Sequence, residues 1–257
     1  MSSASASAAP GCEHIPPFSI TRRGVFAGAA GLLAALVLAL PAGAPAASSP
    51  DVGRGTSLAP HLLLIHGGSF LFEDPLFEPL TRERAVAAGF VPHYLSYPLD
   101  DLPAAVEAAR AEARRLNARY PGRVYAYGTS AGGTLAALLA GDGMVQAAVA
   151  KAPVSDLVAW RWPLETYGSD YYERIGATIQ DRFRLSPLRR RALRPLLIVH
   201  GRGDRVVPPG MSRQYAAKFK QVHLWVVQGG HHTERARPEL LRRAFQWLAR
   251  TARAESR

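Results

Sequence analysis

The fold is decided by the stretch VYAYGTSAG, residues 124–132, in which an apolar run passes directly into a segment rich in Ala and Leu. The run predicts a strand over 124–128, and the following segment predicts a helix over 131–140. A strand that turns at once into a helix strains the residue between them, and the residues two positions to either side must be small because strand and helix meet there. Gly128 and Gly132 meet that requirement around Ser130.

Outward from this turn, short apolar runs punctuated by Gly and Pro alternate with segments of helical spacing. The runs predict six strands, at 61–65, 90–96, 124–128, 147–152, 195–201 and 222–228. The segments between them predict helices at 75–88, 103–120, 131–140, 211–220 and 238–252. Because parallel strands need crossover connections, this alternation predicts an α/β fold with a mostly parallel, about six-stranded sheet covered by helices on both faces. Residues 153–194 break the rhythm and predict a small lid insertion.

Polar residues follow several of these strands, at the sheet edge where ligand sites of α/β folds lie. The turn at Ser130 should lift its hydroxyl above the sheet and aim the amino terminus of the next helix at an oxyanion formed beside it. The sequence therefore predicts that Ser130 is a nucleophile. The glycine-rich loop HGGSF, residues 66–70, follows the first strand, and we expect N–H groups of Gly68 and Ser69 to join that of Ala131 in an oxyanion hole.

Four motifs together carry a family resemblance: HGGSF, YGTSAGG, SPLRRRALRPLLIVHGRGDRVVP and VVQGGHH. This succession resembles the α/β-hydrolase superfamily, and within it the secreted carboxylesterases and the catalytic domains of prolyl-oligopeptidase-like enzymes. The resemblance extends over about 60–252. Only about 14 residues separate the expected signal cleavage site from the first strand, so we expect a reduced sheet and no propeller domain, which favours cleavage of simple esters over peptides.

The resemblance also implies the partners of the serine. The loop H-G-x-x-D-x-x-V-P supplies the triad acid in such enzymes, which points to Asp204, and the base follows the next strand after a Gly, which points to His231. The neighbouring His232 is the alternative base, since only one of two adjacent imidazoles can lie between serine and acid. Asp156 is an alternative acid, although an Asp there is equally typical of a helix cap.

The function expected is therefore hydrolysis of carboxylic esters through an acyl-enzyme. Peptidase, amidase or acyltransferase activity of the same fold is the alternative among enzymes. A catalytically silent hydrolase-like module that binds anionic polymers is the alternative of a different class. The expected partner is a small acyl ester or amide.

The amino terminus predicts export. Arg22 and Arg23 precede an apolar stretch, 25–40, and a small-residue run, which together resemble a twin-arginine signal peptide. Cleavage after Ala46 would leave 47–257 as a single α/β-hydrolase domain outside the cell or in its envelope. A Sec-type signal or an uncleaved anchor is the alternative, although the apolar stretch is short for a membrane span.

Composition excludes several other classes of protein. Cys12 is the single cysteine, so neither an internal disulfide nor a thiolate zinc site can form. No metal motif or nucleotide loop occurs in the mature region, and we expect neither a metal nor a cofactor. The net charge is +11, but the arginines are scattered, so no nucleic acid partner is expected, and membrane contact is expected only through the signal. The sequence does not indicate an oligomeric state.

Overall fold

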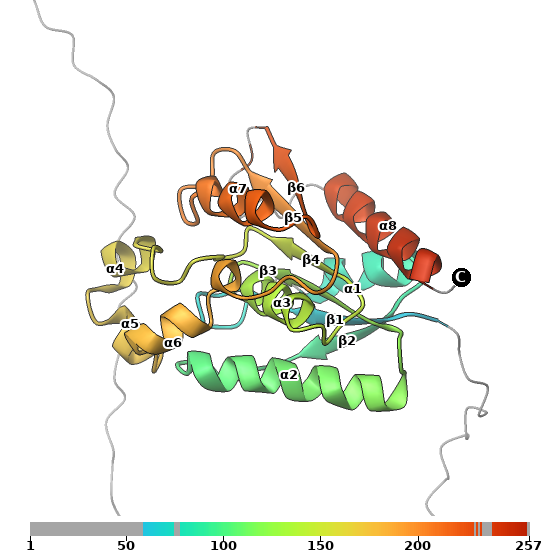
Figure 1. The fold of residues 1–257 in the computed structure, drawn as a ribbon, viewed down its shortest axis with the longest axis horizontal. Coiled ribbons are helices and arrows are strands. Elements are labelled where there is room, and N and C mark those ends of the chain that lie inside the picture. Colours follow the sequence, from blue (N-terminus) through green and yellow to red (C-terminus); the bar gives the residue numbers. More distant parts are fainter. Residues whose placement is uncertain (1–58, 75–77, 229, 231, 233–237, 256–257) are drawn as a thin grey trace, which may run out of the picture. The chain divides into compact units, whose positions relative to one another are not determined.

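The computed structural model of the protein describes residues 59–74, 78–228, 230, 232 and 238–255 (Figure 1). Its sheet has the strand order β2-β1-β3-β4-β5-β6, and every neighbouring pair is parallel. The strands are β1 His61–Ile65, β2 Val91–Leu95, β3 Val124–Thr129, β4 Ala148–Lys151, β5 Leu196–Gly201 and β6 Val222–Val227. The predicted α/β class and the six-stranded sheet are confirmed.

Helices connect the strands as a parallel sheet requires. The main ones are α1 Glu78–Ala87, α2 Leu102–Arg119, α3 Ala131–Gly141, α7 Pro209–Lys218 and α8 Pro238–Glu255. The helix α7 begins two residues earlier than the predicted range of 211–220. Its first residue is Pro209, and proline favours the first helical turn because its fixed φ suits the helix and its missing N–H is not needed there.

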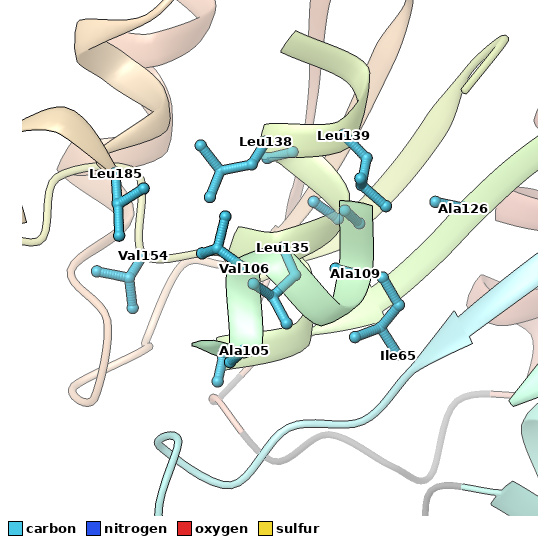
Figure 2. Close-up of a cluster of buried hydrophobic side chains, with 14 of the residues drawn as sticks. Ile65, Ala105, Val106, Ala109, Ala126, Leu135, Leu138, Leu139, Val154 and Leu185 are labelled. Atoms are coloured by element: carbon cyan, nitrogen blue, oxygen red, sulfur yellow. The ribbon is translucent and has the colours of Figure 1, made fainter. Parts of the chain in front are cut away.

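Strand residues alternate between two cores, one on each face of the sheet. Leu63 and Ile65 point to the core covered by α2 and α3, whereas Leu62 and Leu64 point to the core covered by α1 and α8. Figure 2 shows side chains of α2, α3, β1 and β3 meeting in the first of these cores. Every residue of α3 is buried, which explains its run of Ala, Gly and Leu.

The edge position of β2 and the register of β1, β3 and β4 can be traced to particular residues. Pro92 lacks a backbone N–H, and β2 accordingly lies at one edge of the sheet. Ile65 of β1 pairs with Gly128 of β3, and Thr129 of β3 pairs with Lys151 of β4. The loops that leave β1 and β3 therefore start side by side, at the carboxyl edge of the sheet.

The insertion predicted over 153–194 consists of short helices between β4 and β5. They are α4 Trp162–Tyr167, α5 Tyr171–Arg174, α6 Ile179–Arg184 and the 3-10 helix η1 Pro187–Arg189. The insertion belongs to the compact unit formed by Gly55–Arg257. Among the described helices, none combines the length and the apolar character needed to span a bilayer. The predicted signal peptide, 1–46, lies outside the described residues.

Candidate active site

Ser130 lies at the sharp turn between β3 and α3. Its backbone has φ 53° and ψ −117°, in a region that a non-glycine residue rarely occupies. Such a conformation costs about 1–3 kcal/mol and persists only where the surrounding structure enforces it. The N–H of Ser130 donates to the carbonyl of Lys151 at 2.8 Å, so the turn is tied to β4 while the side chain stays available.

The two glycines beside the turn are required by close backbone contacts. A Cβ on Gly128 would lie 2.1 Å from the carbonyl oxygen of Gly132. A Cβ on Gly132 would lie 2.2 Å from the carbonyl oxygen of His66 and 2.3 Å from that of Ile65. The sequence argument that small residues must flank the serine therefore agrees with the geometry.

One imidazole joins Ser130 to Asp204, and it belongs to His232. Nε2 of His232 lies 2.8 Å from Oγ of Ser130, and Nδ1 lies 2.8 Å from Oδ2 of Asp204. The side chain of Asp204 is fully buried, whereas that of His232 is 12% exposed. The arrangement matches the serine, histidine and acid geometry of acyl-transfer enzymes.

The prediction that His231 holds this position is corrected by these two contacts. His232 occupies the place between serine and acid, and only one imidazole fits there. His231 lies outside the described residues. The physical reason involves Gly230, whose carbonyl accepts from the N–H of Gly203 beside the turn to Asp204; the described histidine that follows it and reaches Ser130 is His232.

The carboxylate of Asp204 is held on both oxygens. Oδ1 accepts the N–H groups of Val206 and Val207, each at 2.9 Å, and Oδ2 accepts from His232. Burial by itself raises the pKa of Asp204, but hydrogen bonds from His200 and His232 outweigh it and hold the pKa far below its usual range. Asp204 is therefore ionised, as the partner of a proton-accepting imidazole must be.

The loop predicted to supply oxyanion donors lies directly against the serine. A Cβ on Gly67 would be 3.4 Å from Cβ of Ser130, so the loop backbone touches the turn. Gly68 and Ser69 both have positive φ, of 119° and 54°. Among the hydrogen bonds of the described residues, none uses the N–H groups of Gly68, Ser69 or Ala131. These three donors are therefore available for an oxyanion.

Aromatic side chains of the insertion brace the loops of the site. The hydroxyl of Tyr171 donates to the carbonyl of Ser69 at 2.7 Å, and the indole N–H of Trp160 donates to the carbonyl of Val206 at 2.7 Å. Both rings are buried. One brace thus reaches the oxyanion loop and the other reaches the loop that carries Asp204. Both residues lie within the predicted insertion, 153–194, and nothing in the sequence indicates their partners.

The alternative acid, Asp156, has other partners. Its Oδ1 accepts the N–H groups of Val158 and Ala159, and its Oδ2 pairs with Arg189 at 3.0 Å. These contacts are those of a capped turn, which agrees with the capping interpretation. Within the described part of the chain, no cluster of His, Cys, Asp and Glu has the arrangement of a metal site.

Comparisons with known proteins support the same fold. The structure is similar to esterase 2 of Thermogutta terrifontis phosphoramylated by tabun, with TM-score 0.65, 21% identity, and coverage of 78% of this chain and 86% of that one. It is also similar to an esterase of Pyrobaculum calidifontis, with TM-score 0.61, 24% identity, and coverage of 77% of each chain. A third similar structure is an acetyl ester-xyloside bifunctional hydrolase of Caldicellulosiruptor lactoaceticus, with TM-score 0.64, 17% identity, and coverage of 74% and 82%.

At these identities the similarity establishes the α/β-hydrolase fold. A search of curated protein sequences gave no match. The family itself is established by sequence, since the model of the prolyl oligopeptidase family matches residues 93–255, which include Ser130, Asp204 and His232. The chain therefore belongs to the prolyl oligopeptidase family.

Proposed function

We propose that this protein is a serine hydrolase that cleaves small carboxylic esters with Ser130, His232 and Asp204 as its catalytic triad. The observation that carries the proposal is the continuous chain of hydrogen bonds from Oγ of Ser130 through His232 to the ionised Asp204. This chain lies beside a loop whose backbone donors are available, so a nucleophile, a base and an oxyanion site are present together.

The first half of the reaction forms an acyl-enzyme. Nε2 of His232 accepts the hydroxyl proton of Ser130 while Oγ forms a bond to the carbonyl carbon of the ester. The carbonyl oxygen becomes an oxyanion, which the N–H groups of the oxyanion loop and of Ala131 stabilise. The tetrahedral intermediate then expels the alcohol, which takes the proton from Nε2, and the acyl group remains on Oγ.

The second half releases the acid by the same route. A water molecule gives a proton to Nε2 of His232 and bonds to the acyl carbon, and collapse of this intermediate returns the proton to Oγ of Ser130. The carboxylate of Asp204 accepts a hydrogen bond from Nδ1–H of His232 throughout, which fixes the tautomer of the ring and stabilises the imidazolium. Both halves use only groups of the chain and water.

Two activities of the same fold compete with ester hydrolysis. The family is named for a peptidase, which supports a test on amides, whereas the similar structures are those of esterases and an acetyl ester hydrolase. We favour esters because an alcohol is a better leaving group than an amine. Its departure therefore requires no additional contact between the protein and the leaving group. Acyl transfer to an acceptor other than water uses the same acyl-enzyme and is the third outcome to test.

The deciding experiment measures hydrolysis of p-nitrophenyl butyrate and of a p-nitroanilide peptide by the wild type and by Ser130→Ala. Release of nitrophenol that the Ser130→Ala variant lacks supports the proposal, and faster release of nitroaniline would assign a peptidase instead. A fluorophosphonate probe followed by mass spectrometry should place the label on Ser130. A protein that neither turns over ester or amide nor reacts with the probe would be a binding module.

His231→Ala and His232→Ala form a matched pair for the base. The two residues are adjacent and chemically identical, but the contacts to Ser130 and Asp204 belong to His232. Removing a triad member costs on the order of 10⁴-fold or more in kcat, so we expect that loss for His232→Ala and less than about tenfold for His231→Ala. The opposite ranking would return the role of base to His231.

We also propose that the protein is exported. The support is the sequence pattern of Arg22 and Arg23 before an apolar stretch and a small-residue run. Changing both residues to Lys should leave uncleaved precursor inside the cell, while the wild type reaches the envelope or the medium. Normal secretion of the double variant would point to a Sec-type route.

A further inference from the structure

His200 is a buried imidazole that the proposed reaction does not use. It is the fifth residue of β5, and its side chain is completely inaccessible to solvent. Nδ1 lies 2.7 Å from the hydroxyl oxygen of Ser212 in α7. Nε2 lies 2.9 Å from the carbonyl oxygen of Val207 and 3.2 Å from Oδ2 of Asp204. The ring therefore lies between a helix and the acid of the triad.

These partners determine which ring nitrogen carries the proton. A carbonyl and an ionised carboxylate can only accept hydrogen bonds, so Nε2 must be the donor toward Val207 and Asp204. The hydroxyl of Ser212 can donate, so it satisfies the lone pair of Nδ1. Ser212 thus fixes the tautomer of His200 in which the N–H points at the triad acid.

Asp204 consequently has polar neighbours in four directions. Two backbone N–H groups reach Oδ1, and two imidazoles, those of His232 and His200, face Oδ2. We propose that His200 is a positioning residue for the triad: its Nε2–H holds the carboxylate of Asp204 in the orientation that His232 needs and shares the charge of Oδ2. This inference rests on the proposed function, because it assigns His200 a role in the same site.

Sharing Oδ2 has a predictable electrostatic effect. The hydrogen bond from His200 draws negative charge away from the bond between Asp204 and His232. Without it, the carboxylate attracts the imidazolium of His232 more strongly, so the base holds its proton to higher pH. The acid limb of the pH dependence of kcat/KM reports protonation of the base, so it should then shift to higher pH.

A matched pair of variants isolates the donor. The amide nitrogen of Gln can take the place of Nε2, whereas the shorter Asn reaches only the position of Nδ1. His200→Asn should therefore lose the contact to Asp204 and keep the one to Ser212, and His200→Gln should do the reverse. We expect His200→Asn to lose about 10- to 100-fold in kcat with KM within about threefold, and to shift the acid limb upward by about half a pH unit or more.

His200→Gln should stay within about fivefold of the wild type, with its acid limb unmoved. Ser212→Ala is a third, smaller perturbation, because it removes the hydroxyl that orients the ring of His200. It should shift the acid limb to higher pH by less than His200→Asn does. Thermal unfolding of each variant checks that the rates refer to folded protein. Equal behaviour of the Asn and Gln variants would overturn the proposal. If neither folds, an unchanged profile in Ser212→Ala would overturn it.

A second readout does not depend on turnover. In a Ser130→Ala background, nitrogen NMR of the ring of His232 follows its titration directly, and adding His200→Asn should move the midpoint to higher pH. If the wild type hydrolyses no ester or amide but this midpoint moves, the proposed function fails and the coupling of His200 to Asp204 stands. If ester hydrolysis is confirmed and neither readout responds to His200→Asn, the inference alone fails.

Discussion

Gly132→Ala places one methyl group where the fold has no room for it. Gly132 is the second residue of α3, and its added Cβ would lie 2.2 Å from the carbonyl oxygen of His66 and 2.3 Å from that of Ile65. Both neighbours are backbone atoms at the end of β1 and the start of the oxyanion loop. No flexible side chain can move aside, so the clash must be relieved by moving the helix or the strand.

The size of that movement follows from the distances. Ordinary contacts of a Cβ begin at 3.4 Å, so the shortfall against the carbonyl of His66 is 3.4 − 2.2 = 1.2 Å. Because α3 is buried along its whole length, a displacement of this size disturbs a packed core and should cost about 3 kcal/mol of unfolding free energy. Ser130 and the oxyanion loop lie on opposite sides of the clash. A misplacement of about 1 Å between reacting groups lowers kcat by about 10²-fold.

Gly210→Ala is the matched control. Gly210 is the second residue of α7, and its added Cβ would have no neighbour within 4 Å. The same substitution there should be neutral or should stabilise the protein by about 0.4–1 kcal/mol, with kcat unchanged. Urea unfolding followed by circular dichroism gives the free energies, and hydrolysis of p-nitrophenyl butyrate gives the rates. If the unfolding free energies of the two variants agree within about 0.5 kcal/mol and their kcat values agree within about twofold, the close-contact argument is wrong.

Three further predictions test the relay, the brace and the buried imidazole at the amino end of β1. Ser130→Ala combined with His232→Ala should be no slower than either single variant, since members of one relay act as a unit, and steady-state kinetics would show any additivity. Tyr171→Phe leaves the buried carbonyl of Ser69 without its donor, and we expect a loss of about 1–3 kcal/mol in urea unfolding together with a lower kcat. Burial, reinforced by nearby positive charges, lowers the pKa of His61 to about 4, so its ring stays neutral in the folded protein while the unfolded chain takes up a proton below about pH 6.5. The unfolding free energy should therefore fall as the pH is lowered from about 6.5 to 4, and in His61→Leu this fall should be smaller; equal slopes would contradict the assignment.

The fold was predictable because its signals are local. Each strand is a short apolar run whose length is typical of a strand, and Gly and Pro punctuate the runs. The turn at Ser130 is local too, since Gly128, Ser130 and Gly132 lie within five residues of one another. Backbone strain and close packing at such a turn limit the residue types that can occupy it. The predicted nucleophile and acid, Ser130 and Asp204, lie in the site together.

The braces of the site were not predictable because they join distant segments. Tyr171 and Ser69 are 102 positions apart, and Trp160 and Val206 are 46 apart. An aromatic residue in an irregular segment gives the same sequence signal whether its side chain lines a pocket or forms a hydrogen bond that joins two loops. Only the folded chain shows which carbonyl its polar group reaches.

The choice between the two adjacent histidines depends on a contact between loops. The N–H of Gly230 donates to the carbonyl of Val227 at 3.3 Å, and the carbonyl of Gly230 accepts from the N–H of Gly203 at 2.8 Å. A Cβ on Gly201 would lie 2.4 Å from that same carbonyl oxygen, so Gly230 is pressed against the turn that leads to Asp204. This anchor sets where the chain after β6 starts toward Ser130, and His232 is the residue that arrives there. The family pattern places the base directly after a glycine and contains no information about this contact between loops. It therefore predicted His231 instead of His232.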